Sequence, residues 1–139
     1  MKISTLVDTN VLVDVWGPPG AGTDWSLSAL VSCRRDGSLV TSPIVWAELA
    51  PLASDQSSLD VAARRMGLER EDLPWDAAFP AGQAHARYRR AGGTRERTLP
   101  DFLIGAHALV AGHRLLTRDP KGYRSYFPDL RIVSPETFP

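Results

Sequence analysis

The sequence is poor in cysteine, in net charge and in long apolar runs, and each shortage excludes a class of protein. Cys33 is the only cysteine among 139 residues, so neither a disulfide framework nor a cysteine-based zinc site can form within the chain. Lys+Arg and Asp+Glu balance at 16 each, so any polyanion must be bound by a local basic patch. No run approaches the ~18 apolar residues of a membrane span, and Asp8 interrupts the apolar N-terminal stretch, which excludes a signal peptide. We therefore expect a soluble, cytoplasmic protein without membrane association.

Short apolar runs alternate with helical segments along the chain. The runs that predict strands are 3–7, 38–41, 72–76, 114–117 and 131–133. Buried parallel strands are short and apolar, and the helices between them cover both faces of the sheet. The sequence predicts an α/β, three-layer fold with a mostly parallel central sheet of four to five short strands, in one domain covering residues 1–139.

Four acidic residues lie where parallel strands are expected to end. Asp8 follows the first strand, Asp119 follows the strand at 114–117, and Asp101 opens the helix that leads to that strand. Glu48 lies on the helix after the second strand. Ligands of open α/β sheets bind at the carboxyl ends of the strands, so these side chains should share one edge. Clustered carboxylates repel one another unless a cation is bound, and Mg²⁺ and Mn²⁺ prefer such oxygen ligands.

Asp101 also has a purely structural interpretation. Thr98 and Asp101 fit the capping-box pattern of a helix N-terminus, and Pro100 suits its first turn. The local pattern leaves both roles of Asp101 open.

Other polar residues are interpreted as structural. His85, His107 and His113 lack the spacing of metal ligands, so each is expected to be a surface or core histidine. Asp14, one helical turn after Asn10, is expected to be a solvated helix acid.

Four motifs, in this order, resemble the PIN domain, and more narrowly the VapC-type toxins of bacterial toxin–antitoxin pairs. They are VDTNVLVD at 7–14, SPIVWAELA at 42–50, LPDFLIGAHAL at 99–109 and LLTRD at 115–119. The resemblance implies a PIN-like fold and a Mg²⁺- or Mn²⁺-dependent endoribonuclease toxin that cleaves single-stranded RNA and is neutralised by a cognate antitoxin.

The resemblance also implies roles for individual residues. The implied catalytic residues are Asp8, Glu48, Asp101 and Asp119. Asp8, Asp101 and Asp119 are the implied metal ligands, and Asn10 and Thr117 are the supporting polar residues. No acid occurs among the four residues after Asp101, which favours one well-held ion over two.

Arginines beside these motifs are candidates for binding RNA. The stretch RYRRAGGTRER at 87–97 leads directly to Asp101, so Arg95 and Arg97 are expected to bind phosphate, as is Arg118 next to Asp119. The alternative is a solvated helix C-terminus, where arginine is favourable in any case. Further candidates, for stacking on unpaired bases, are Tyr88, Tyr123 and Tyr126, although at least two of them are expected to pack within the protein instead.

The expected partner surface lies in the N-terminal part of the chain. It consists of Trp16, Trp25, Leu27 and Leu30. Exposed apolar side chains of this kind mark interaction sites, although both tryptophans could simply belong to the core. The resemblance further implies a homodimer.

Three rival functions can be compared with these motifs. A metal-dependent phosphatase or receiver domain would need an acidic neighbour beside Asp8 and a well-placed lysine, and the chain has neither. A PIN-type RNA-processing nuclease without antitoxin fits the same motifs. A catalytically idle PIN-like binding module should have a broken acid set, whereas this set is intact.

Overall fold

The protein is built on a five-stranded sheet with strand order β3-β2-β1-β4-β5, and every neighbouring pair is parallel. This computed structural model describes residues 2–139. The elements, in chain order, are β1 (Thr5–Val7), α1 (Thr9–Trp16), α2 (Thr23–Asp36), β2 (Leu39–Thr41), α3 (Pro43–Leu49), the 3₁₀ turn η1 (Ala50–Leu52), α4 (Gln56–Met66), β3 (Leu68–Arg70), α5 (Trp75–Arg90), α6 (Leu99–Ala111), β4 (Arg114–Leu116), α7 (Lys121–Tyr126) and β5 (Ile132–Val133).

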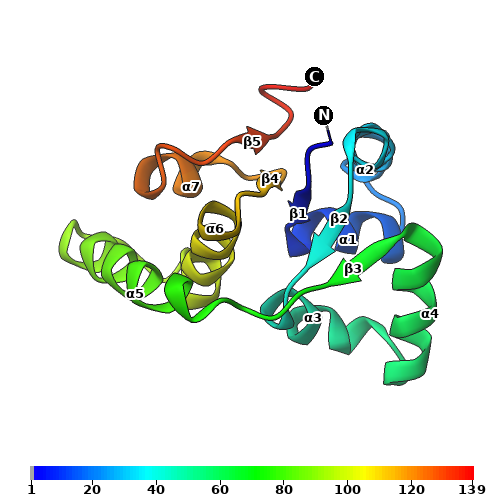
Figure 1. Ribbon diagram of the computed structural model, residues 1–139, viewed down its shortest axis with the longest axis horizontal. Coiled ribbons are helices and arrows are strands. Elements are labelled where there is room, and N and C mark those ends of the chain that lie inside the picture. Colours follow the sequence, from blue (N-terminus) through cyan, green and yellow to red (C-terminus); the bar gives the residue numbers. More distant parts are fainter. Residues whose placement is uncertain (1) are drawn as a thin grey trace.

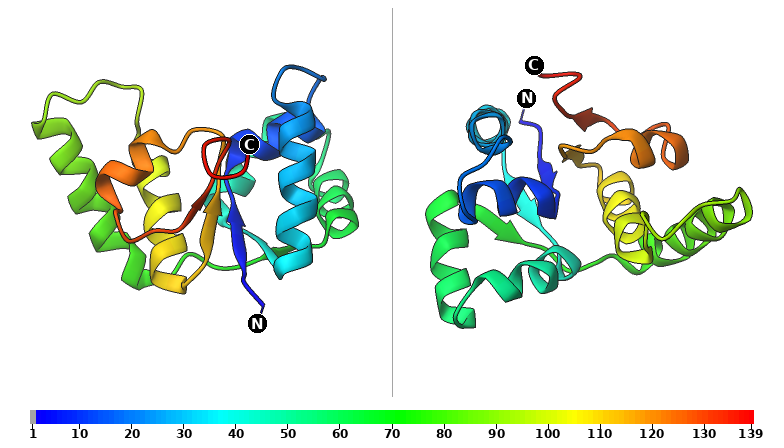
Figure 2. Two further views of the ribbon diagram at one scale, coloured as in Figure 1. Left: turned by 90° about the horizontal axis from the view of Figure 1, so that it is seen from above. Right: turned by 180° about the vertical axis from the view of Figure 1, so that it is seen from behind.

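The helices cover the sheet on both sides. Figures 1 and 2 show α5, α6 and α7 on one side of the strands and α1, α2 and α4 on the other. The predicted α/β class and the predicted central sheet of four to five short, mostly parallel strands are confirmed, and the sheet has five strands that are all parallel.

Local signals explain where the elements begin and end. Ser42 caps α3 by accepting a hydrogen bond from Val45 N at 3.2 Å, and Pro43 follows at the first helical position. Gly67 and Gly112 end α4 and α6 in the left-handed conformation, at φ 75° and 76°, which costs glycine little. Gly67 leads directly into β3, and one residue, His113, separates Gly112 from β4.

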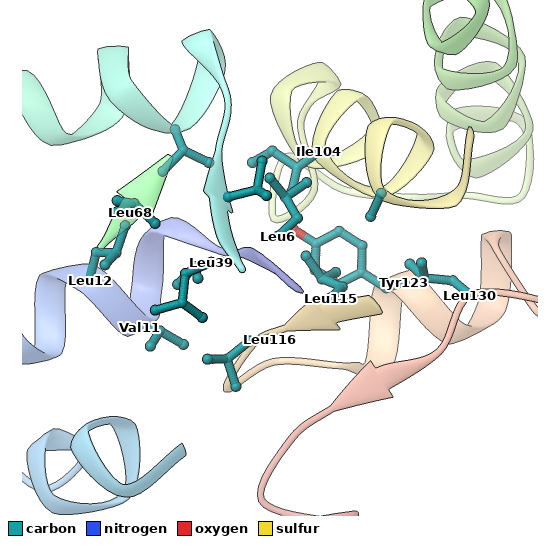
Figure 3. Packing of buried hydrophobic residues seen from close by; sticks show 14 of the residues in the cluster. Leu6, Val11, Leu12, Leu39, Leu68, Ile104, Leu115, Leu116, Tyr123 and Leu130 are labelled. Atoms are coloured by element: carbon teal, nitrogen blue, oxygen red, sulfur yellow. The ribbon is translucent and has the colours of Figure 1, made fainter. Parts of the chain in front are cut away.

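The core lies between the central strands and the surrounding helices. All three residues of β1 and of β2 are buried, as expected for parallel strands covered on both faces. Leu6, Leu115 and Leu116 are fully buried, and Figure 3 shows them among leucines from several elements. Because β1 lies between β2 and β4, the residues that follow these strands meet at one edge of the sheet.

The predicted strand at 72–76 is wrong. The third strand is β3, which pairs with β2 from Leu68 to Arg70, and residues 71–74 form an irregular link to α5. β3 is an edge strand with only Leu68 buried, so it lacks the continuous apolar run by which the inner strands were found.

No helix within residues 2–139 combines the length and hydrophobicity that a membrane crossing requires.

Candidate active site

Asp8 is the most deeply buried acid at the carboxyl edge of the sheet. It follows β1 directly, caps α1 through the 2.8 Å bond from Thr9 N to Oδ1, and is 6% exposed. Oδ2 accepts hydrogen bonds from Thr117 Oγ1 at 2.8 Å and from Tyr123 Oη at 3.0 Å. These three donors fix the carboxylate in one orientation.

Burial raises the pKa of Asp8 from 3.8 to about 6. Desolvation disfavours the charged form, while the hydrogen bonds from Thr117, Tyr123 and Thr9 N oppose the shift, and the nearby charge of Asp101 adds to it. A bound cation would remove this penalty, so the environment of Asp8 suits a metal ligand.

The four predicted acids line one cleft of about 380 Å³. Asp8 comes from β1, Glu48 from α3, Asp101 from the first turn of α6 and Asp119 from the loop after β4. Thr9 Oγ1 holds Glu48 by a 2.7 Å bond to Oε1. Among residues 2–139, no three of these acids bring carboxylate oxygens within 4.8 Å of one another. Their oxygens are therefore spread over the cleft.

The predicted supporting residues, Asn10 and Thr117, are hydrogen-bonded to each other beside Asp8. Asn10 Nδ2 donates to Thr117 Oγ1 at 3.2 Å, and Asn10 Oδ1 accepts from Arg118 N at 3.2 Å. Thr117 Oγ1 also accepts from Asp119 N at 3.1 Å. Thr117 therefore links the loop of Asp119 to the carboxylate of Asp8.

Asp101 has the structural role that its local pattern predicts. Thr98 N donates to Asp101 Oδ2 at 2.9 Å, and the two residues form a capping box. The cap uses Oδ2, so Oδ1 can serve the cleft that Asp101 lines. Capping and ligand binding are compatible in the same side chain.

Two of the three predicted RNA-binding arginines are engaged in ion pairs. Arg97 bonds Asp119 Oδ2 at 2.8 Å, and Arg118 pairs with Asp14, with one bond of 3.0 Å to Oδ1. Both arginines line the acidic cleft, whereas Arg95 is exposed on the loop between α5 and α6.

The interpretation of Asp14 as a solvated acid is wrong. Its side chain is 11% exposed, binds Arg118 and accepts a bond from Ser26 Oγ at 2.6 Å. Arg118 is 104 positions away in sequence, so no local signal indicated this pair.

Tyr123 and Thr9 are site residues whose roles the sequence reasoning missed. Tyr123 was a candidate for stacking on bases, but it is 3% exposed and its hydroxyl donates to Asp8. Figure 3 shows its ring among buried leucines, including Leu6 and Leu115. Tyr123 and Asp8 are 115 positions apart, so only the fold joins them.

A separate apolar groove of about 650 Å³ lies between α1, α2 and α4. The groove is lined by three of the four predicted partner-binding residues, Trp16, Leu27 and Leu30. Trp25 does not line it, because the indole packs on the core and Nε1 donates to Phe138 O at 2.6 Å. The rim of the groove carries the positive charges of Arg34, Arg35 and Arg65.

The side chains of two histidines, His107 and His113, are buried, as expected for core histidines, but they also meet a carboxylate. His107 and His113 both contact Glu71, with Nε2 at 2.8 Å and 2.9 Å from Oε1. This cluster lies outside the acidic cleft.

The fold and the cleft together define an all-parallel α/β protein with an acidic site at the carboxyl edge of its sheet. The sequence model of the PIN domain matches residues 5–127, so the chain belongs to the PIN domain family. A comparison with curated proteins finds no significant match.

Solved structures of toxin–antitoxin proteins share this fold. VapBC2 from Rickettsia felis, bound to a promoter DNA fragment, has a TM-score of 0.73 at 23% identity, with 95% of this chain and 98% of that chain covered. A toxin–antitoxin complex from Klebsiella pneumoniae has a TM-score of 0.69 at 22% identity, covering 94% and 97%. VapC20 from Mycobacterium tuberculosis, described as a sarcin–ricin loop cleaving toxin, has a TM-score of 0.65 at 19% identity, covering 91% and 98%.

Proposed function

We propose that this PIN domain is a metal-dependent endoribonuclease of the VapC toxin type, which acts in the cytoplasm on single-stranded RNA and is neutralised by an antitoxin. The observation that carries the proposal is the convergence of Asp8, Glu48, Asp101 and Asp119 on one cleft in a chain of this family. The likeness to toxin–antitoxin structures supports the same proposal.

The proposed ligands fit Mg²⁺ or Mn²⁺, because all of them are carboxylates. Burial disfavours the charged form of one of them, Asp8, and a bound cation would compensate for this cost. Asp8, Asp101 and Asp119 would hold the ion, and Arg97 would release Asp119. When bound, such an ion supplies a water of lowered pKa and stabilises charge on a phosphoryl group. Glu48 lies on the exposed side of the cleft, where Thr9 orients it to accept a proton. Hydrolysis would leave a 5′-phosphate and a 3′-hydroxyl.

The arginines would bring RNA to the cleft. Arg97 lies against the acids, and Arg95 extends from the same loop into solvent. Guanidinium groups bind phosphate oxygens in pairs of hydrogen bonds, so Arg95 and Arg97 are suited to hold the backbone beside the acids. Arg118 is committed to Asp14, and its proposed contribution to RNA binding is secondary.

The antitoxin would dock in the groove between α1, α2 and α4. An amphipathic helix can place its apolar face in such a groove, against Trp16, Leu27 and Leu30. The arginines at the rim favour acidic residues beside that apolar face. Homodimer formation stays a prediction.

The function is tested with purified protein and total RNA, by mapping new 5′-phosphate ends. EDTA should abolish cleavage, and Mg²⁺ or Mn²⁺ should restore it. Asp101→Asn should lower activity by at least a hundredfold, because it removes a ligand charge from the cleft. Cleavage that persists in EDTA would refute the metal-dependent mechanism.

Asp76 provides the matched control, since it is also an acid in the first turn of a helix, α5, but lies away from the cleft. Asp76→Asn should retain activity. If Asp101→Asn cleaves RNA normally and loses only thermal stability, Asp101 acts as a cap alone.

A further inference from the structure

A histidine–glutamate cluster lies apart from the proposed active site. Glu71 follows β3, His107 belongs to α6, and His113 immediately precedes β4. Asp8 and Asp119, the proposed ligands, follow the carboxyl ends of β1 and β4, whereas His113 lies at the amino end of β4. None of the three cluster residues lines the acidic cleft, so the two sites are separate.

The two imidazoles converge on one atom. His107 Nε2 and His113 Nε2 lie 2.8 Å and 2.9 Å from Glu71 Oε1, and within residues 2–139 this is the one group of three potential ligands whose atoms all lie within 4.8 Å. The side chains of His107 and His113 are 0% and 8% exposed, whereas Glu71 is 38% exposed. Two buried nitrogens thus face a carboxylate that can still move.

The outer nitrogen of His113 adds independent support. His113 Nδ1 has a partner in Ser4 Oγ at 2.5 Å, and a hydroxyl there can accept from the imidazole and orient it, as partners of metal-binding histidines do. His107 Nδ1 is buried without a hydrogen-bond partner among the described residues. An ion at Nε2 would leave this nitrogen unpaired as well, so His107 Nδ1 does not distinguish the metal-bound from the metal-free cluster.

The spacing is close to that of a tetrahedral site. Zinc–nitrogen and zinc–oxygen bonds of about 2.0–2.2 Å place ligand atoms roughly 3.3 Å apart. Withdrawing the Glu71 carboxylate by about half an ångström would meet this spacing, and its partial exposure permits that shift. Solvent on the side of Glu71 can supply the fourth ligand.

We propose that Glu71, His107 and His113 form a binding site for Zn²⁺ or a chemically similar transition-metal ion, distinct from the acidic cleft. Imidazole nitrogens favour zinc-class ions, whereas Mg²⁺ and Mn²⁺ favour the oxygens of the cleft. The ion would join the segment after β3 to α6 and to the start of β4, elements that otherwise meet only through side-chain packing and hydrogen bonds. Its role is structural, because it clamps the α5–α6 half of the molecule to the sheet.

The test is a Co²⁺ titration of untagged, EDTA-treated protein, since tetrahedral Co²⁺ absorbs visible light strongly. We expect one equivalent to bind with a tetrahedral spectrum that Zn²⁺ abolishes. Glu71→Gln and His113→Gln should weaken binding at least tenfold, while Asp101→Asn should leave it unchanged. At a Zn²⁺ concentration a hundredfold above Kd, the Tm of the wild-type protein should rise by about 5–10 °C, and that of Glu71→Gln should not.

Circular dichroism in EDTA shows whether the variants are folded, and Glu71→Gln is the mildest change because it preserves an acceptor oxygen. Absence of a tetrahedral Co²⁺ spectrum in the wild-type protein would overturn the proposal. The same conclusion follows if Glu71→Gln and His113→Gln both bind Co²⁺ as tightly as the wild type. Loss of Co²⁺ binding in Asp101→Asn alone would assign the ion to the acidic cleft instead.

Discussion

Replacing Asp8 with asparagine should make the metal-free protein more stable while removing its activity. Asp8 is buried against Thr117 and Tyr123, and its pKa is raised to about 6. Folding therefore favours the protonated form, which asparagine imitates in shape and charge. The substitution should therefore lower the activity of the proposed site and raise the stability of the folded protein.

The magnitude follows from proton linkage. Between pH 3.8 and about 6 the folded chain binds more protons at Asp8 than the unfolded chain does, so the free energy of unfolding falls as pH rises through this window. Above it the ionised Asp8 costs about 3 kcal/mol. Asparagine avoids that cost but presents an additional donor to two hydroxyl groups, so we expect a gain of roughly 1–3 kcal/mol, or about 3–8 °C in Tm.

The assay is thermal unfolding of wild type and Asp8→Asn in EDTA at pH 7.5 and again near pH 4. The difference in Tm should be largest at pH 7.5 and should shrink near pH 4, where the wild-type carboxyl is mostly protonated. Mg²⁺ should then stabilise the wild type more than the variant. If Asp8→Asn is no more stable than the wild type in EDTA at pH 7.5, the buried charge of Asp8 does not lower the free energy of unfolding.

Two further changes test the groove and the core. Leu27 lines the groove and is 47% exposed. The substitution Leu27→Glu should prevent co-purification with the product of the neighbouring reading frame. It should also keep the protein toxic when both proteins are expressed. Leu109 is 39% exposed and lies away from the groove, so Leu109→Glu should preserve the complex. If both variants bind the partner equally well, the groove is not the docking surface. Gly105→Ala should lower stability by about 1–3 kcal/mol, because its Cβ would come within 2.6 Å of the Phe127 ring. Gly82→Ala, which meets nothing within 4 Å, should be neutral or slightly stabilising in thermal unfolding.

The sequence by itself determined the features that depend on neighbouring residues. The buried inner strands, the cap formed by Thr98 and Asp101, and the positions of Asp8 and Asp119 after their strands could all be predicted. Parallel strands bring their carboxyl ends to one edge, so local order was enough to place the four acids on one cleft. The edge strand β3 was missed because only one of its residues is buried.

Only the tertiary structure decided which side chains meet across the chain. The contact of Tyr123 with Asp8, the pairing of Arg118 with Asp14 and the approach of His107 and His113 to Glu71 join residues 36 to 115 positions apart. Spacing along a helix or strand carries no information about such contacts, because they depend on how the elements pack. The same packing places Trp16 on the groove and turns Trp25 toward Phe138, although the sequence assigned both tryptophans to one partner surface.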